Sequence, residues 1–553
     1  MSARKRREIA ATALCIAAAL SLVLVPGAGA KAKGFSLGVS SGDVSSTSAI
    51  LWAHADKDGT AYLQVVAKGG FGDCEKDNAL AKAKASQKKH DGTVQATVDG
   101  LKPGTAYKYR WCTTKGGKSD TGKFTTAPKS NKNDTVSFAF TGDQDARVAA
   151  GETKPYWNNF EVWTAIQKQK NDFNVGMGDT IYSDSEVPGY TISDIAITVA
   201  QKWAQYAQNL AMKPWAKARG SAAYYGHWDD HEFINDFSQE ESSFPYGDQG
   251  TTNIAGPKLY KDGVQAFTDY TPVTYSKQNG LYRSFRWGKN LEIFFLDERS
   301  FRSASADYNG TCDNPPGSGN PDLAPTAPSS TRQTFSAIIP QLQNPPPQAC
   351  LDAINDPNRT MLGSKQLSTF ENAVKKSSAT FKVIFNEVQI QQYYALPYDR
   401  WEGYEAERQS LLHFLHDNVK NVVFLTTDVH ANMVNDARFC TLESNCPQDS
   451  GILDISTGPV ATESYAGEIN ATIGNQSGGS LIHDVFLKPP PPNGVGMSCA
   501  AINQFSYAEV EVSKSQMTVD LLDADDQPVI DTGNSSTATP ATPRCAQVVI
   551  PAQ

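Results

Sequence analysis

The sequence predicts an α/β domain that follows a smaller all-β domain, and three observations lead to this prediction. The chain has 553 residues, of which 40% are hydrophobic, 10% aromatic and 20% charged, a composition typical of globular proteins. Residues 35–127 contain short alternating apolar runs that Gly- and Asp-rich turns separate. From residue 135, apolar runs of strand length alternate with segments of helical periodicity.

The first region, residues 35–127, is expected to form a fibronectin- or Ig-like β-sandwich domain. The stretch from Leu101 to Tyr109 resembles the E–F corner of fibronectin type III domains, where a tyrosine holds the turn. The polar residues 129–134 are expected to link this domain to the next one. The expected strands of the first domain are 49–52, 61–66, 94–98 and 106–111.

The second region, residues 135–530, carries the α/β pattern. Residues 303–350, which are rich in Pro, Ser and Asn, predict a covering loop between two cysteines. Residues 506–512 and 516–522 predict a closing hairpin, and residues 531–553 are expected to form a C-terminal tail. The other expected strands are 136–141, 173–177, 222–225, 291–296, 381–385 and 422–425. The expected helices are 156–170, 194–211, 364–375 and 404–418.

Residues 1–30 have the pattern of a secretory signal peptide. Four basic residues lie within positions 4–7, an uncharged run extends from Ile9 to Val25, and Ala28-Gly29-Ala30 offers a cleavage site. A signal anchor that stays in the membrane is the alternative, although the run is short for a span. No later hydrophobic run predicts a membrane span. We therefore expect a secreted or extracellular protein, with a periplasmic or cell-surface location as the alternative.

The cysteine count agrees with export. Nine cysteines become eight when Cys15 is removed with the signal, and an even number in an exported chain predicts up to four disulfides. Cys440 and Cys446 form a natural local pair. The pairs Cys74–Cys112 and Cys312–Cys350 are expected from their positions in one domain and one loop. Glycosylation sequons also fit a secreted chain, and they start at Asn133, Asn309, Asn358, Asn470, Asn475 and Asn534.

Polar residues follow most of the expected strands of the second domain, directly after each strand ends. Functional groups of open α/β sheets gather beyond the carboxyl ends of the strands, so these side chains are expected to converge. Each cluster alone has an ordinary structural explanation, such as a turn or a helix start. The clusters contain Asp143 and Asp145, Asp179 and Tyr182, Asp229 to Glu232, Asn386 and Glu387, and Asp428 and His430.

Converging carboxylates predict metal binding, because unpaired negative charges would repel one another and resist burial. Carboxylate and imidazole groups suit hard or borderline divalent ions, and a phenolate such as that of Tyr182 suits ferric iron. The chain has a net charge of -9, which gives no support for a nucleic-acid-binding surface. Bound metals would nevertheless allow an acidic protein to bind a phosphate ester. The sequence makes no prediction of oligomeric state.

The order of these clusters resembles the PhoD-like alkaline phosphatase/phosphodiesterase family of metallophosphoesterases. The resemblance covers about residues 35 to 530 and includes Leu51-Trp52 and the Leu296 to Arg302 segment. It implies a four-layer α/β/β/α metallophosphoesterase sandwich preceded by a fibronectin III-like domain. The motifs are Asp143, Gly178-Asp179-x-x-Tyr182, Trp228-Asp229-Asp230-His231-Glu232 and Asp428-x-His430.

The resemblance also implies a site with two metal ions. Asp179 would bridge them, Asp143, Tyr182 and His430 would complete the first site, and Asp230 with Asp428 would hold the second. Iron is expected beside Tyr182, with calcium, zinc or manganese as the second ion. Many family members have a Cys where this chain has Asp143, and that change makes the first site harder. Asn386 is a further ligand candidate, and Asp145 is expected either to bind or to orient a ligand.

The implied reaction is hydrolysis of a phosphate mono- or diester by metal-activated hydroxide. His231 would contact the scissile phosphate and protonate the leaving oxygen. Arg147, Arg299 and Arg302 are candidate phosphate-binding groups, with an ion pair to Asp297 as the alternative for the latter two. A phospholipase D-like phosphodiesterase acting on phospholipids is an alternative function. A non-catalytic surface-binding protein on the same fold is another.

Overall fold

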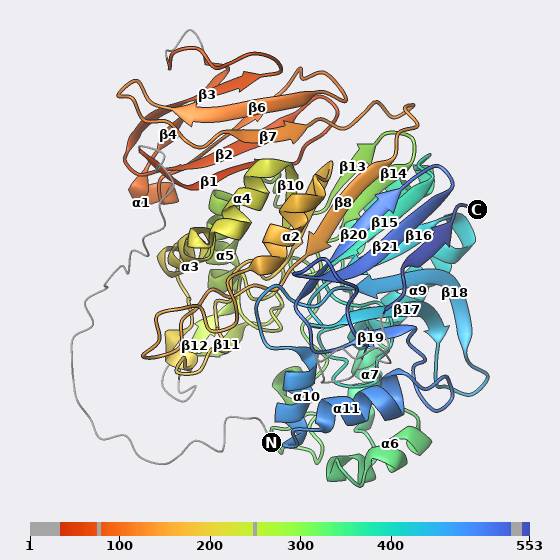
Figure 1. Ribbon diagram of the computed structural model, residues 1–553. Coiled ribbons are helices and arrows are strands. Elements are labelled where there is room, and N and C mark those ends of the chain that lie inside the picture. Colours follow the sequence, from red (N-terminus) through yellow and green to blue (C-terminus); the bar gives the residue numbers. More distant parts are fainter. Residues whose placement is uncertain (1–33, 75–78, 247–251, 532–544) are drawn as a thin grey trace, which may run out of the picture.

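The computed structural model describes residues 34–74, 79–246, 252–531 and 545–553 (Figure 1). The expected signal peptide, with Cys15, and the sequon at Asn534 lie outside these residues. Within the described part of the chain, no helix has the length and apolar character needed to cross a membrane.

The N-terminal region consists of two antiparallel sheets, drawn in red and orange in Figure 1. All four strands expected here are present, each with slightly wider limits. The hydroxyl of Tyr107 accepts a hydrogen bond from the backbone N–H of Lys102 at 2.9 Å, which ties the corner before its strand. One sheet has the order β1 (Phe35–Gly42), β2 (Ala49–Ala55), β5 (Thr93–Val98), and the other β4 (Ala81–Ala85), β3 (Gly59–Val66), β6 (Ala106–Cys112), β7 (Gly122–Thr125); α1 is Gln87–His90.

A six-stranded sheet forms the first half of the α/β region. Three of its strands, β8 (Val136–Thr141), β9 (Phe173–Met177) and β10 (Ala223–His227), are parallel. The expected hairpin, β20 (Ser506–Val512) and β21 (Gln516–Asp523), continues the sheet beside β8. The edge strand β22 (Val548–Pro551) comes from the expected tail, so the end of the chain completes this sheet.

A seven-stranded mixed sheet forms the second half. Its central strands β14 (Leu291–Phe295), β15 (Phe381–Asn386), β16 (Val422–Thr426) and β18 (Gln448–Ser456) are parallel. Of these, β15 and β16 are mostly apolar and buried along their whole length, as expected for parallel strands that are covered on both faces. The antiparallel strands β13 (Arg283–Trp287), β17 (Asn432–Cys440) and β19 (Cys499–Ala501) complete the order β13-β14-β15-β16-β18-β17-β19.

The two large sheets share a hydrophobic core. The rings of Phe138 and Phe140 on β8 lie 6.0 and 5.9 Å from the ring of Phe385 on β15, with edge-to-face geometry. The outer face of the six-stranded sheet packs against α2 (Glu161–Gln169), α3 (Val199–Ala211), α4 (Lys213–Ser221) and α5 (Gly256–Tyr270). The outer face of the other sheet packs against α8 (Ser364–Lys376) and α9 (Glu405–Asn418). The α/β class is therefore confirmed.

Residues 303–350 form a compact segment of short helices, η5 (Tyr308–Gly310), α6 (Ser329–Phe335) and η6 (Pro340–Gln343), and α7 (Gln348–Ile354) follows it. Opposite them lie α10 (Tyr465–Ile473), α11 (Gly478–Ile482) and η8 (His483–Leu487), and Phe335 meets Phe486 edge-to-face at 5.5 Å (Figure 1). We call residues 303–350 the covering segment. The hairpin of β11 (Ser243–Tyr246) and β12 (Thr252–Ala255) is separate from the larger sheets.

Four disulfides connect the eight remaining cysteines. The predicted pairs Cys74–Cys112, Cys312–Cys350 and Cys440–Cys446 are confirmed, and the fourth bond joins Cys499 to Cys545. The second closes the covering segment, and the fourth fixes the C-terminal strand to the body of the protein.

We predict that Tyr107→Phe lowers the free energy of unfolding by about 1 kcal/mol, because the N–H of Lys102 loses its acceptor. Urea denaturation of purified protein would measure the change. Tyr62→Phe on the neighbouring strand β3 is the control, since its half-buried side chain sits outside that corner. An equal loss in both variants would show that the corner hydrogen bond contributes nothing.

Candidate active site

The ends of strands from both large sheets meet at one place. Thr427, just after β16, donates its hydroxyl to the carbonyl of Met177 at the end of β9, at 2.5 Å. The N–H of Asp428 donates to Asp143 Oδ1 at 3.3 Å, and the N–H of Val460 donates to the carbonyl of Gly142 at 2.9 Å. Hydrogen bonds between the strand ends of the two sheets thus fix the loops that carry the predicted site residues.

Four predicted metal ligands have left-handed backbone conformations. The φ angles are 60° at Asp143, 45° at Asp179, 66° at Asp428 and 53° at His430. Residues other than glycine adopt this region rarely and at an energetic cost, and such residues cluster at functional sites. Gly178 has the same sign of φ, and a Cβ there would lie 2.6 Å from the Cβ of Asp229. Only glycine therefore lets the Asp179 loop pass this close to its neighbour.

The first group of candidate ligands brings together Asp143, Asp179 and His430, whose ligand atoms all lie within 4.8 Å of one another. The Tyr182 hydroxyl lies 3.0 Å from Nε2 of His430. The other ring nitrogen of His430 contacts Glu468 Oε1 at 2.8 Å. A carboxylate on the far nitrogen is the usual way to orient a metal-binding histidine, so Glu468 aims Nε2 at the group.

The second group overlaps with the first. The ligand atoms of Asp179, Asp230 and His231 lie within 4.8 Å of one another, and so do those of Asp229, Asp230 and Asp428. Asp179 therefore belongs to groups on both sides. The family resemblance implies a bridging role for Asp179, and its place in adjoining groups is compatible with that prediction.

Several oxygens in these groups are buried and have no hydrogen-bond partner, namely Asp143 Oδ2, Asp229 Oδ2 and Asp230 Oδ1. Burial raises the pKa of Asp143 to about 6 and that of Asp229 to about 8, and it raises the pKa of Asp179 well above its usual range. In each case burial outweighs the compensation that neighbouring groups give to the charged carboxylate. Oxygens left in this way fit metal cations, which would supply the missing positive charge.

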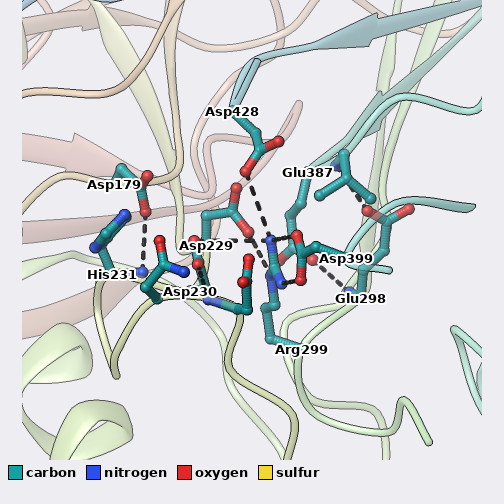
Figure 2. Close-up of polar contacts among 12 residues, drawn as sticks. Asp179, Asp229, Asp230, His231, Glu298, Arg299, Glu387, Asp399 and Asp428 are labelled. Carbon is teal, nitrogen blue, oxygen red and sulfur yellow. Dashed lines mark hydrogen bonds and ion pairs between the residues drawn. The ribbon is translucent and has the colours of Figure 1, made fainter. Parts of the chain in front are cut away.

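One arginine holds the acidic residues in place (Figure 2). Arg299 is fully buried, and its Nε donates to Asp229 Oδ1 at 2.5 Å. Its Nη1 and Nη2 form a bidentate pair with Asp399 at 2.6 and 2.9 Å, and Nη2 lies 3.8 Å from Asp428. The short ion pairs of Arg299 thus involve Asp229 and Asp399. Its guanidinium makes no ion pair with Asp297, which accepts the backbone N–H of Arg299 at 3.2 Å.

The loop around Asp179 depends on a buried carboxylate, that of Glu232. Glu232 accepts the N–H groups of Asp179, Thr180 and Asp229 at 3.1, 2.7 and 2.8 Å. Burial raises its pKa to about 7 even with these three donors. Glu232 therefore positions two of the acidic residues through their backbone rather than facing the group of ligands itself.

His231 is arranged differently from His430. Its Nδ1 lies 2.6 Å from Asp184 Oδ1, and its ring stacks on that of Tyr182 with centroids 4.1 Å apart. The backbone N–H of His231 donates to Asp179 Oδ1 at 3.1 Å. Burial by itself lowers the pKa of His231, but Asp184, Asp179 and Asp230 raise it well above its ordinary value. The imidazole is thus set up to hold a proton beside the acidic groups.

Two further buried acids, Glu298 and Glu387, lie on the side of Arg299 that is opposite Asp179 and His231 (Figure 2). Glu387 Oε2 accepts the N–H of Glu298 at 2.5 Å, and its other oxygen lies 3.2 Å from Nδ1 of His227. Burial raises the pKa of Glu298 to about 8 and lowers that of His227 to about 3. These groups are buried behind the ligands.

Two residues predicted for the site, Asn386 and Arg147, make their contacts with residues other than the candidate ligands. Asn386 is fully buried, donates its amide to the carbonyl of Val388 and accepts from Trp401 Nε1 at 3.3 Å. Arg147 is half-buried and lies over the ring of Tyr190 at 4.3 Å, with its Nε buried and unpaired. Both oxygens of Asp145 accept hydrogen bonds, from the hydroxyl of Ser185 at 2.5 Å and from the backbone N–H of Arg147 at 2.9 Å.

Three residues with direct roles in this geometry were not found from the sequence. Asp184 follows Tyr182 in the same loop, so the Gly-Asp-x-x-Tyr motif extended by two residues would have included it. Asp399 and Glu468 come from segments that lack a strand-end pattern, and no sequence signal marks them.

Two models of known protein families match this chain. The model of the PhoD-like phosphatase family matches residues 147–521, and the model of the N-terminal domain of PhoD-like phosphatases matches residues 21–128. The chain belongs to the PhoD-like phosphatase family. The resemblance drawn from the sequence motifs is thereby confirmed.

Individual relatives of this PhoD-like chain add detail. It is 26% identical over 434 residues to alkaline phosphatase D of Bacillus subtilis (strain 168), an alignment that covers 72% of this chain and 64% of the relative. A structure of PhoD has a TM-score of 0.67 at 19% identity and covers 95% of this chain and 92% of that one. Purple acid phosphatase PPD1 from yellow lupin (Lupinus luteus) has a TM-score of 0.52 at 11% identity, covering 90% and 74%.

We predict that Asp399→Asn lowers the free energy of unfolding by about 3–5 kcal/mol, because it leaves Arg299 and Arg302 buried without their shared carboxylate. Guanidinium denaturation would measure the loss. Asp436→Asn is the matched control, since it removes an ion pair with Arg438 at 3.0 Å whose carboxylate is 41% exposed. We expect less than about 1 kcal/mol there. Equal losses in the two variants would contradict the special role of Asp399.

Proposed function

We propose that this PhoD-like chain is a secreted, metal-dependent hydrolase that cleaves phosphate mono- or diesters. The observation that carries the proposal is the position of Asp179 in two adjoining groups of candidate ligands, among oxygens that are buried without a partner. Family membership supports the same class of reaction. The proposal includes the fold detail, a four-layer α/β/β/α sandwich after a fibronectin III-like domain at 35–127, with 135–530 as the catalytic domain.

Two cations are proposed at this place. Asp143, Asp179, Tyr182 and His430 would hold the first, and Asp179, Asp230 and Asp428 the second. A phenolate ligand favours iron at the first position, while the carboxylates of the second suit calcium, zinc or manganese. When bound, the cations supply Lewis acidity toward the phosphate oxygens and lower the pKa of water.

The residues of the chain have separate tasks in the proposed reaction. Glu468 holds the His430 ring so that Nε2 faces the first position. His231, with Nδ1 engaged by Asp184, would give a proton from Nε2 to the leaving oxygen. Arg299 keeps Asp229, Asp230 and Asp428 together from inside the protein, which supports a positioning role rather than contact with the phosphate. Arg147 stays a candidate for phosphate binding.

We predict that Asp179→Asn removes most of the bound metal and lowers hydrolysis of p-nitrophenyl phosphate and bis-p-nitrophenyl phosphate to background, because one shared ligand serves both positions. Elemental analysis and the two assays measure this. Asp262→Asn, at a helix-surface ion pair with Lys258, is the control and should keep both. Full activity of the Asp179 variant would exclude the proposed mechanism.

For His231→Ala we expect a rate loss of about 10²–10⁴-fold with the metal content unchanged, because a proton donor is removed and the ligands stay in place. The control is His416→Ala, which should behave as wild type. His416 is an exposed residue of α9, and its ring contacts the carbonyl of Ser450 on β18. Loss of metal from the His231 variant would instead assign His231 to metal binding. Stoichiometric metal without hydrolysis of any ester by the wild type would favour a surface-binding protein.

A further inference from the structure

An apolar cavity of about 200 Å³ lies between the covering segment and the helices α10 to η8. In Figure 1 these are the green α6 and the blue α10 and α11 in the lower part of the molecule. The wall is built mainly of aliphatic and aromatic side chains from both sides, among them Leu323, Phe335, Leu342, Ile469, Phe486 and Leu487.

The charged groups in this wall are largely neutralised by partners. Arg332 forms a bidentate pair with Asp322 at 2.7 and 2.8 Å. Arg400 lies 3.5 Å from Glu402 and over the ring of Tyr393, although its Nε is buried without a partner. The cavity thus presents an apolar surface with one cationic group, that of Arg400, whose Nε has no hydrogen-bond partner.

The cavity adjoins the candidate active site directly. Glu468 lines the cavity and contacts Nδ1 of His430 at 2.8 Å. Tyr465, another lining residue, donates its N–H to the carbonyl of His430 at 3.2 Å. Arg400 also lines the cavity and interacts electrostatically with Asp428. A molecule with its phosphate at the acidic groups would therefore have this cavity within reach of its ester group.

Exposed apolar side chains gather around the same place. Among the described residues, Leu396 is 42% exposed and lines the cavity, while Ile338 at 38% and Val485 at 40% adjoin the lining residues Ile339 and Phe486. Singly scattered apolar side chains at a surface are ordinary, whereas several that gather at one place mark an interaction or a ligand-binding groove. Their position around the cavity indicates an apolar entrance.

We propose that this cavity binds the alkyl chain of the phosphate ester that the adjacent site hydrolyses, so that the substrates are amphiphilic esters. The inference rests on the proposed phosphoesterase function and adds its substrate class. The volume exceeds the roughly 150 Å³ of an apolar cavity known to bind benzene, so a short alkyl chain fits. Arg400, at the junction of cavity and acidic groups, complements the phosphate charge.

The test uses ethyl, butyl, hexyl and octyl phosphate, and the matching methyl alkyl diesters, below their micelle concentrations with the metal-loaded protein. Product formation is followed by phosphorus NMR. We expect kcat/KM to rise about three- to fourfold for each added methylene until the cavity is filled, as for methylenes removed from water. Equal rates for ethyl and octyl esters would overturn the inference. No hydrolysis of any ester would instead overturn the proposed function.

Two variants fill the cavity from opposite walls. Ala327→Phe on the covering segment and Ile473→Trp at the end of α10 should each lower kcat/KM for octyl esters at least about tenfold and leave ethyl esters unchanged. Ile473 is half-buried, so this variant keeps the test valid if Ala327→Phe does not fold.

The entrance is tested separately. Leu396→Ser should reduce the preference for long chains, whereas Leu80→Ser, an equally apolar side chain that is 57% exposed on the N-terminal region, should not. Preference for octyl esters that survives both filled-cavity variants would show that the chain binds elsewhere.

Discussion

Negative charge buried where two sheets meet is the constraint on which this structure depends. Asp143, Asp179, Asp229 and Asp230 are almost completely buried, and Arg299 is the cation that contacts this set most closely within the described part of the chain. A single guanidinium cannot compensate so many carboxylates, which explains the raised pKa values and the unpaired oxygens. Cations bound at this place would supply the missing positive charge, so we expect metal binding to stabilise this protein.

The surrounding structure works to keep these carboxylates from relaxing apart. The two sheets supply rigid strand ends, and hydrogen bonds join the loops between them, such as that from the backbone N–H of Asp428 to the carboxylate of Asp143. Left-handed backbone at four candidate ligands is a strain that such rigid anchoring sustains. Behind the ligands, Asp399 and Glu232 fix Arg299 and the Asp179 loop, respectively. The acidic side chains are thus preorganised before any ligand binds.

The sequence predicted those strands and site residues that a local sequence pattern marks. Strands β8 and β9 have the predicted limits, because each is a short apolar run followed by Gly-Asp, which marks where the strand ends. Asp143, Asp179, Asp230, Asp428 and His430 follow such strands, and the structure brings them together. Asp399 and Glu468 were missed because they approach from a loop and a helix whose placement depends on tertiary packing. For Arg299 both phosphate binding and an ion pair to Asp297 were open, because an arginine near a strand end gives no indication of whether it faces outward or inward; its ion-pair partners are Asp229 and Asp399 instead.

The carboxylate at position 143 does two things at once, which bears on the departure from the family pattern. Its Oδ1 accepts the N–H of Asp428 from the opposite sheet, and its Oδ2 is buried without a partner beside Asp179 and His430. A cysteine has a single sulfur, which is a weak hydrogen-bond acceptor, and cannot serve both directions equally. Aspartate thus joins the two sheets while keeping one hard oxygen directed at the first metal position. At the proposed first metal position, a carboxylate favours an ion that prefers oxygen over a softer thiophilic one.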